Sequence, residues 1–94
     1  MGKKIILCVD DESSILESLE MELSLKNKNF LIELAESGQE ALQITEELVK
    51  EGNHLTVVIS DYIMPTMKGD ELLIKLHKLY PLSKKILLTG QAAL

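Results

Sequence analysis

Short apolar runs alternate with amphipathic stretches along the whole chain. The apolar runs predict strands over residues 4–9, 30–35, 55–60 and 85–89. The stretches between them repeat apolar side chains at helical spacing and predict helices over residues 14–26, 38–50 and 69–79, and residues 90–94 are predicted to begin another. Gly52 and Pro81 mark the expected ends of the second and third helices. This order predicts an α/β fold with a parallel sheet and helices on both faces.

The predicted helices each have one apolar face that should lie against the sheet. The expected inward side chains are Ile15, Leu16, Leu19 and Leu23 in the first helix and Leu72, Leu73, Leu76 and Leu79 in the third. The first and third strands are apolar almost throughout, which is typical of strands that are covered on both faces.

Carboxylates follow two of the predicted strands where these strands end. Asp10 and Asp11 follow the first strand, Asp61 follows the third, and Thr89 ends the fourth. Right-handed crossovers bring the carboxyl ends of parallel strands to one edge of the sheet, which is where such folds bind ligands. We therefore expect one acidic pocket at this edge. Carboxylates that lie together repel each other and recruit a cation, and a cation beside a carboxylate suggests phosphoryl chemistry.

Each of these residues also has a purely structural interpretation. Asp10 or Asp11 is suited to cap the helix that starts near Ser14, because aspartate is a favoured N-cap. Ser13 and Ser14 also have the character of helix caps, Asp61 is suited to open a turn, and Thr89 to be an ordinary strand residue. The coincidence of four such residues at one sheet edge favours the pocket.

Composition narrows the possible functions of the chain. Its 94 residues are enough for one small domain, and 46% hydrophobic with 27% charged residues indicates a globular protein. All ten basic residues are lysine and the net charge is −5, so this segment is not expected to bind nucleic acid. No apolar stretch is long enough for a membrane helix or a secretory signal, so no membrane association and a cytoplasmic location are expected. Cys8, the single cysteine, is expected to be buried.

The chain resembles the receiver domains of two-component response regulators. The resemblance is carried by Val9-Asp10-Asp11-Glu12, by Ser37-Gly38-Gln39-Glu40-Ala41-Leu42, by the turn from Ser60 to Gly69 with its Asp-x-x-Met-Pro-x-Met-x-Gly pattern, and by Leu87-Leu88-Thr89-Gly90-Gln91. It implies a flavodoxin-like, doubly wound parallel sheet with strand order 2-1-3-4.

The resemblance also implies the roles of the site residues. Asp61 is then the phosphoacceptor, and Thr89 bonds the phosphoryl group once it is attached. Asp11 and Asp61 hold Mg²⁺ directly, Asp10 holds it mostly through water, and the backbone carbonyl of Ile63 is a further ligand. These roles agree with the preference of Mg²⁺ for carboxylate and carbonyl oxygens. The implied phosphoryl donor is a histidine kinase or a phosphotransfer protein, and the partner that responds is an output domain that the sequence does not identify.

The sequence departs from this family in one respect. Family members continue for about another helix, strand and helix, and their fifth strand carries a lysine that pairs with the phosphoryl group and an aromatic switch residue. Residues 1–94 match neither, so we expect a receiver domain that is incomplete at its C-terminus, with the fifth strand and last helix missing. The fourth strand is then an exposed edge, with Ile86, Leu87 and Leu88 facing water and available for homo-oligomer formation.

Two rival functions remain open at this stage. One is a phosphorylation-independent scaffold or dimerisation module with a receiver fold. The other is a Mg²⁺-dependent phosphohydrolase, which is disfavoured because Ile63 stands where that class carries a second aspartate. We therefore expect a phosphoacceptor domain and not an enzyme with its own substrate.

Overall fold

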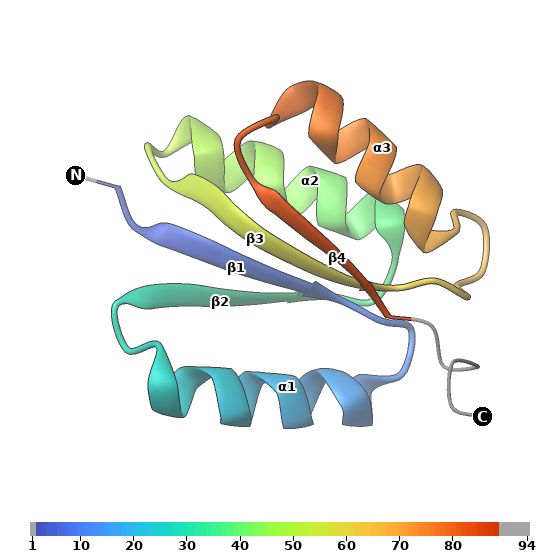
Figure 1. Cartoon of the computed structure of the whole chain (residues 1–94), viewed down its shortest axis with the longest axis horizontal. Coiled ribbons are helices and arrows are strands. Elements are labelled where there is room, and N and C mark those ends of the chain that lie inside the picture. The colour runs from blue at the N-terminus through green and yellow to red at the C-terminus, as the bar shows by residue number, and fades with distance from the viewer. Residues whose placement is uncertain (1, 89–94) are drawn as a thin grey trace.

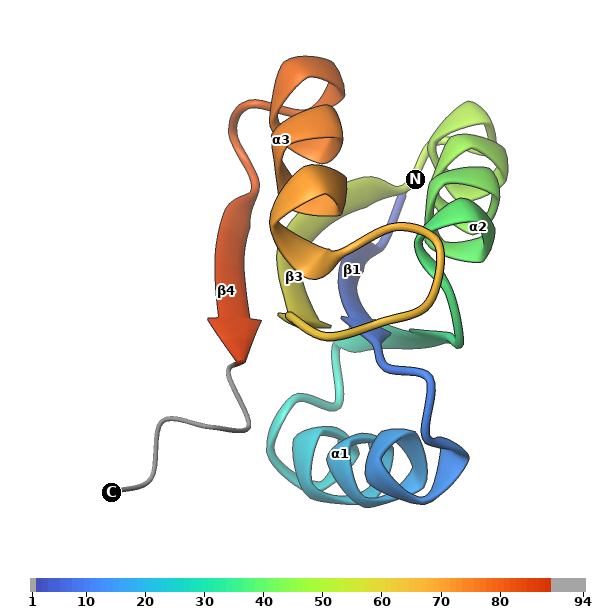
Figure 2. The same ribbon diagram turned by 90° about the vertical axis from the view of Figure 1, so that its right-hand side faces the viewer.

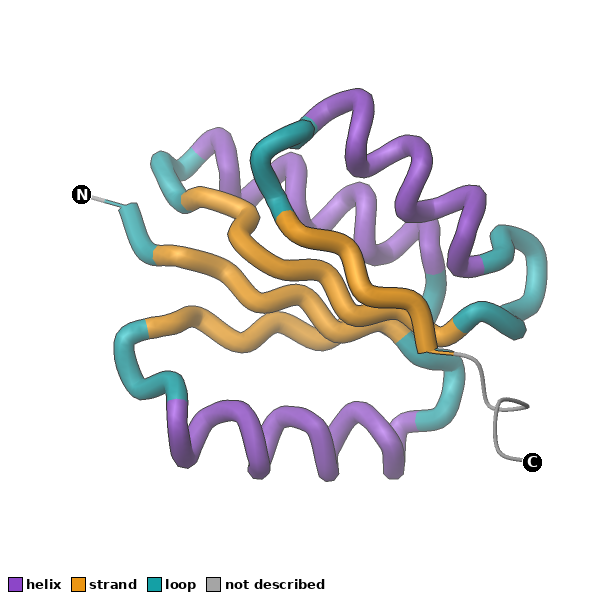
Figure 3. The backbone as a smooth tube through the Cα atoms, in the orientation of Figure 1, coloured by secondary structure: helices purple, strands orange, loops and turns teal. Residues whose placement is uncertain are grey.

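The structure alternates strands and helices in the predicted order (Figures 1 and 3). It is a computed structural model that describes residues 2–88. The strands are β1 (Lys4–Val9), β2 (Phe30–Ala35), β3 (His54–Asp61) and β4 (Lys84–Leu88), and the helices are α1 (Ser13–Lys26), α2 (Gly38–Lys50) and α3 (Gly69–Leu79). These bounds agree with the predicted ones to within one residue over the described part of the chain. The predicted strand residue Thr89 and the predicted helix over 90–94 lie outside it.

The four strands form one parallel sheet in the order β2-β1-β3-β4, as predicted. Helix α1 covers one face, and α2 and α3 cover the other (Figures 1 and 2). After β2 the chain crosses to the opposite side of β1, so the strand order reverses between β1 and β3. In doubly wound sheets this reversal opens a crevice at the carboxyl ends of the two strands, which is where ligands bind.

Each face of the sheet has its own apolar core. On the side of α2 and α3, the fully buried side chains include Leu7, Val9, Val58, Leu72 and Leu76. On the side of α1, Ile6, Cys8 and Leu16 form a smaller core, supported by partly buried side chains of β2 and β3. Cys8 is fully buried, as expected.

Two of the predicted inward side chains are in fact exposed. Ile15 is 39% exposed, because α1 turns Leu16, Leu19 and Leu23 toward the sheet and leaves Ile15 at the margin of this face. Leu79 is 62% exposed, because it is the last residue of α3 and the next residue, Tyr80, packs against the core instead.

The outer edge of β4 pairs with no other strand among residues 2–88. Its apolar side chains are accordingly exposed, with 45% of Ile86, 36% of Leu87 and 40% of Leu88 in contact with solvent. This exposure was predicted from the sequence. Ile86 and Leu88 extend the face formed by Ile59 and Asp61, with which they are in register.

Candidate functional site

Three carboxylates meet at the carboxyl ends of β1 and β3. Val9 pairs with Ser60 across the two strands, so Asp10 and Asp61 leave the sheet at the same level. Asp10, Asp11 and Asp61 each offer a carboxylate oxygen, and these oxygens lie within 4.8 Å of one another. The structure thus brings together the three acidic side chains that the sequence predicted to share a pocket. This spacing allows a single cation to contact all three.

Asp10 is the buried member of this group. Only 4% of it is exposed, and its Oδ1 accepts a hydrogen bond from the backbone N–H of Glu12 at 2.9 Å. Burial raises the pKa of Asp10, the Glu12 N–H opposes this, and the negative charges of Asp61, Asp11 and Glu12 raise the pKa further. Asp61 is half-buried and Asp11 is exposed. The pocket therefore has a fixed acidic floor and an open rim, an arrangement in which a cation relieves the repulsion.

The structural interpretations of these aspartates do not agree with the structure. The N-cap of α1 is Glu12, whose side chain makes no capping hydrogen bond, so neither Asp10 nor Asp11 caps the helix. Ser13 is already the first helical residue, and the expectation that Ser13 and Ser14 are caps is wrong. Asp61 is the last residue of β3 and stands in register with Leu88 of β4, so it belongs to the sheet and not to a turn.

The loop between β3 and α3 is held at both ends by backbone hydrogen bonds. Tyr62 N donates to Leu88 O, and Gly69 N donates to Tyr62 O, both at 2.9 Å. Inside the loop, the side chains of Met64 and Met67 are buried and form part of the core. The segment after Asp61 is therefore fixed both to the neighbouring strand and to the first turn of α3.

One residue of this loop has a strained backbone. Thr66 has a φ of 71°, which is rare for a β-branched residue. Met67 N donates to Pro65 O at 2.8 Å across Thr66, which closes a three-residue γ-turn. Such strain persists only where surrounding contacts enforce it, and it is frequent near functional sites.

Sequence reasoning missed two contacts that position this loop. A Cβ atom placed on Gly38, at the start of α2, would lie 2.6 Å from Met67 Sδ, so the loop packs closely against this helix. The ammonium group of Lys68 lies 5.8 Å from the ring centre of Tyr62. Gly38 and Gly69 both occur in the motifs quoted above, but their contacts cannot be read from residue spacing.

The predicted roles of Ile63 and Thr89 stay predictions. The side chain of Ile63 is 56% exposed, and Thr89 lies outside residues 2–88.

Comparison with known proteins gives the family. Residues 6–94 match the model of the response regulator receiver domain. The chain therefore belongs to the receiver domain family of two-component signalling, whose members typically accept phosphoryl groups and are not enzymes. The three carboxylates lie close enough together to hold one metal ion.

Individual relatives are consistent with this family. The chain is 36% identical over 91 residues to the sensor kinase CckA of Brucella abortus, but it spans only 9% of the length of that protein. The receiver domain protein of Methanospirillum hungatei is 36% identical with a TM-score of 0.79, and the match covers 99% of this chain and 69% of that one. Response regulator TrrA of Thermotoga maritima, crystallised with Mg²⁺ and BeF, is 36% identical with a TM-score of 0.75, and the match covers 95% and 71% of the two chains.

None of the helices in residues 2–88 is both long enough and apolar enough to span a lipid bilayer.

Proposed function

We propose that Asp61 accepts a phosphoryl group from a phosphohistidine of a kinase or phosphotransfer protein, and that Mg²⁺ is required. The observation that carries this proposal is the convergence of three carboxylate oxygens within 4.8 Å at the point where the strand order reverses. Three oxygen donors of this kind suit Mg²⁺, which usually keeps several waters beside one or two carboxylates. The complex of TrrA with Mg²⁺ and BeF gives independent support.

The residues of the pocket would bind the ion in different ways, according to their exposure to solvent. Asp11 and Asp61 stand at the open rim and would hold the ion directly, together with the carbonyl of Ile63. Asp10 is buried on the floor and would act mostly through water. When bound, Mg²⁺ supplies positive charge that neutralises the oxygens of the phosphoryl group during transfer.

Asp61 would act as the nucleophile. One of its carboxylate oxygens attacks phosphorus, the bond between phosphorus and the imidazole nitrogen breaks, and the electron pair of that bond stays on the imidazole. The product is an acyl phosphate on Asp61, which adds about −1.5 to −2 charges and several hydrogen-bond acceptors.

The added charge would act on the neighbouring strand. Asp61 is in register with Leu88, and Tyr62 N already bonds Leu88 O, so the phosphoryl group forms beside the end of β4. Thr89 follows directly and would donate its hydroxyl hydrogen bond to the phosphoryl oxygens. The exposed face of β4 would then change its affinity for a partner or an output domain, because phosphorylation shifts a conformational equilibrium when it favours one state. A cytoplasmic location, where histidine kinases hold their phosphoryl groups, is part of this proposal.

The direct test is incubation with acetyl phosphate and Mg²⁺, followed by intact mass measurement. We expect an increase of about 80 Da that Asp61→Asn abolishes, and that Asp70→Asn, at an exposed acidic residue of α3, leaves unchanged. An adduct that persists in Asp61→Asn would remove Asp61 from the central role.

A phosphorylation-independent dimerisation module is the second candidate. The exposed apolar side chains of β4 favour it, because the outer edge of β4 pairs with no strand among residues 2–88 and such edges pair with other chains. Light scattering combined with a Mg²⁺ titration separates the two functions. A dimer that forms equally with and without Mg²⁺, in a protein that takes up no phosphoryl group, would support the module.

A further inference from the structure

The amino ends of the four strands lie at the edge of the sheet opposite to the acidic pocket, and this edge is strongly basic. We define the basic edge as residues 2–4, 26–29, 50–54 and 78–84, which precede or begin the strands. These segments contain seven lysines and one glutamate, which gives them a net charge of +6. Because the whole chain has a net charge of −5, the remaining residues together carry −11. Acidic side chains also reach this end of the molecule, since Glu46 lies 3.7 Å from Lys50. Lysines nevertheless outnumber acidic side chains in the segments of the basic edge.

Helix stability explains only part of this excess of lysines. Lys26, Lys50 and Lys78 occupy last turns of helices, where a positive charge is favourable beside the helix dipole. The other four lysines of the basic edge have no such role: they are Lys3, Lys4, Lys28 and Lys84. Their concentration at one edge of an acidic protein calls for a different explanation.

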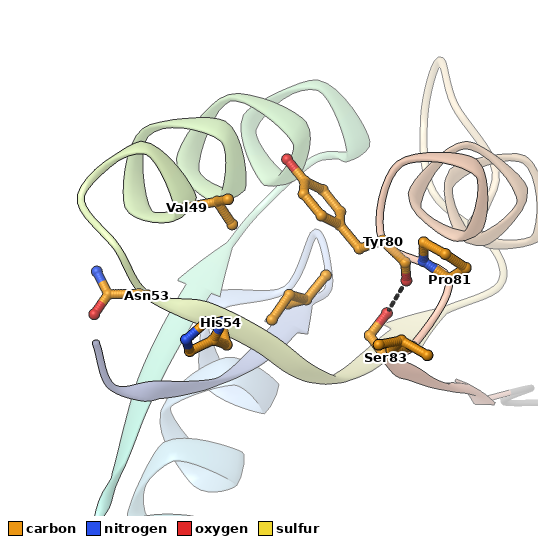
Figure 4. Close-up of a pocket in the computed structure, with 8 residues that line it drawn as sticks. Val49, Asn53, His54, Tyr80, Pro81 and Ser83 are labelled. Atoms are coloured by element: carbon orange, nitrogen blue, oxygen red, sulfur yellow. Dashed lines mark hydrogen bonds between the residues drawn. The ribbon is translucent and has the colours of Figure 1, made fainter. Parts of the chain in front are cut away.

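A cavity of about 300 Å³ opens at the same edge (Figure 4). Its apolar lining comes from three segments: the end of α2, the start of β3 and the loop between α3 and β4. Val49, Leu55, Tyr80, Pro81 and Leu82 form this lining, and Asn53, His54 and Ser83 add polar groups. This volume is at the lower end for ligand sites and suits one or two apolar side chains better than a cofactor.

The loop that forms one wall of the cavity is rigidly held. The carbonyl oxygen of Tyr80 accepts hydrogen bonds from Ser83 Oγ at 2.8 Å and from Lys85 Nζ at 3.0 Å, and Lys85 Nζ also donates to Ser83 O at 2.7 Å (Figure 4 shows the first). Ser83 is buried, whereas Leu82 next to it is 97% exposed. If a partner covered Leu82, little loop entropy would be lost, because these hydrogen bonds already hold the loop.

We propose that the basic edge binds an acidic segment of a partner protein, with an apolar side chain of that segment in the cavity and against Leu82. The complementary charges would steer the segment to this edge, and the apolar anchor would supply most of the affinity. A flat lipid surface has no side chain to insert into the cavity, and the chain has no arginine for the bidentate contacts that specific recognition of nucleic acid favours. A second copy would have to present its acidic pocket to this edge, in a head-to-tail arrangement that builds rings or filaments and not a two-fold dimer.

This site is independent of the proposed phosphorylation. Eight residues of β3 separate the two edges, a distance of roughly 26 Å at the usual rise per residue. A partner at the basic edge therefore leaves Asp61 open to a phosphoryl donor.

The test begins with a displayed library of random dodecapeptides. Peptides are selected on the 94-residue chain and counter-selected on Leu82→Ser, a variant that should fold normally because Leu82 is exposed. We expect the surviving peptides to share a leucine or aromatic residue flanked by several aspartates or glutamates. Loss of all binders after counter-selection, or survivors without acidic residues, overturns the proposal.

Fluorescence anisotropy with a labelled survivor then measures affinity. We expect Leu82→Ser to weaken binding about tenfold and Lys84→Glu about fivefold, with the latter also reducing the salt dependence. Matched controls are Met21→Ser, at a residue of α1 that is 67% exposed, and Lys75→Glu, on the exposed side of α3; both should bind like the native chain. Asp61→Asn should also bind normally, which separates this test from that of phosphorylation. Equal weakening by the control variants would overturn the proposal.

Two further measurements test whether a lipid surface or a second copy of the chain occupies the basic edge instead. If Leu82→Ser abolishes binding to phosphatidylserine vesicles while no peptide binds, the edge contacts lipid and the proposal is wrong. If light scattering shows a dimer that Leu82→Ser dissociates, the occupant is a second copy and the proposal is wrong as well. Vesicle binding and self-association that are absent, or unchanged in this variant, support a protein segment as the occupant.

Discussion

The carbonyl oxygen of Asp61 lies directly against the α carbon of Gly69. A Cβ atom placed on Gly69 would fall 2.1 Å from that oxygen and 2.8 Å from Leu87 Cδ1. The N–H of Gly69 also donates to the carbonyl of Tyr62. The first turn of α3 thus holds the backbone of the proposed phosphoacceptor and touches the neighbouring strand, and only glycine permits so close an approach.

Gly69→Ala should therefore destabilise the domain and disturb the pocket together. The added methyl group meets backbone, which cannot turn aside, so we expect the free energy of unfolding to fall by about 2–3 kcal/mol. Mg²⁺ affinity should fall as well, because Asp61 must move. Urea denaturation with and without Mg²⁺ measures both effects.

Gly38→Ala is the matched control for this variant. Its added methyl group would meet the side chain of Met67, at 2.6 Å from Sδ, and a methionine side chain can change rotamer. The loss should therefore be smaller, about 1 kcal/mol. Equal losses in the two variants would show that contact with Asp61 is not what makes Gly69 necessary.

Relief of strain at Thr66 should stabilise the protein. Thr66 has a φ of 71°, a conformation that glycine adopts without steric cost. A non-glycine residue in this conformation is strained by about 1–3 kcal/mol. Glycine removes this strain but destabilises the fold by roughly 0.5–1 kcal/mol, because it makes the unfolded chain more flexible. Thr66→Gly should raise the free energy of unfolding by about 1 kcal/mol in urea titrations. Thr56→Gly, in strand β3, should lower it; a decrease in both variants would mean that Thr66 is not strained.

The elements and their order could be predicted because each follows from a local pattern. The carboxylates of Asp10, Asp11 and Asp61 could be placed together because strand order alone brings the ends of β1 and β3 to one edge. The side chains at the margins of helices could not be predicted reliably. Ile15 and Leu79 fit the helical period, but their burial depends on how far the sheet extends beneath the helix.

Contacts made by loops could not be predicted from the sequence either. The spacing of residues gives no indication that Gly38 meets Met67, because this contact depends on the path of the loop after β3. The cavity beside Leu82 was missed for a similar reason: its lining comes from three segments that the fold brings together. The lysines of the basic edge were counted as part of the composition, and only the sheet topology shows that they lie at one edge.

Cys8 should be unreactive in the folded protein. Its side chain is fully buried, and burial together with the charge of Glu20 raises the pKa of the Cys8 thiol to about 11. At pH 8 the fraction of reactive thiolate then falls about 100-fold below that of an ordinary thiol, and burial slows access further. Alkylation by iodoacetamide at pH 8, followed by mass spectrometry, should be at least 100 times slower than in urea. Similar rates in both conditions would show that β1 opens readily.

Asp10→Asn should stabilise the domain at neutral pH in the absence of divalent cations. Burial and the neighbouring carboxylates raise the pKa of Asp10, so the native state binds this proton more tightly than the unfolded chain does. The stability that protonated Asp10 contributes to the fold is fully present at pH values below the ordinary carboxyl pKa. It is lost as the pH rises through the raised pKa of Asp10. Asparagine has no charge to bury and keeps an oxygen for the N–H of Glu12. The expected gain at pH 7 is about 1–3 kcal/mol, the repulsion between charges at this spacing.

Magnesium should reduce the stability advantage of Asp10→Asn over the native protein. At ten times its dissociation constant, Mg²⁺ should stabilise the native protein by about 1.4 kcal/mol, and Asp10→Asn by clearly less, because the variant has lost one carboxylate of the pocket. Thermal unfolding at pH 5 and pH 7, with and without Mg²⁺, measures both effects, and the advantage of the variant should shrink at pH 5. Asp70→Asn is the control: Asp70 lies in the first turn of α3, where a negative charge is favourable, so its loss should destabilise slightly and leave the effect of Mg²⁺ unchanged. A variant Asp10→Asn that is less stable without Mg²⁺, or equally stabilised by it, would mean that Asp10 serves the fold and not the ion.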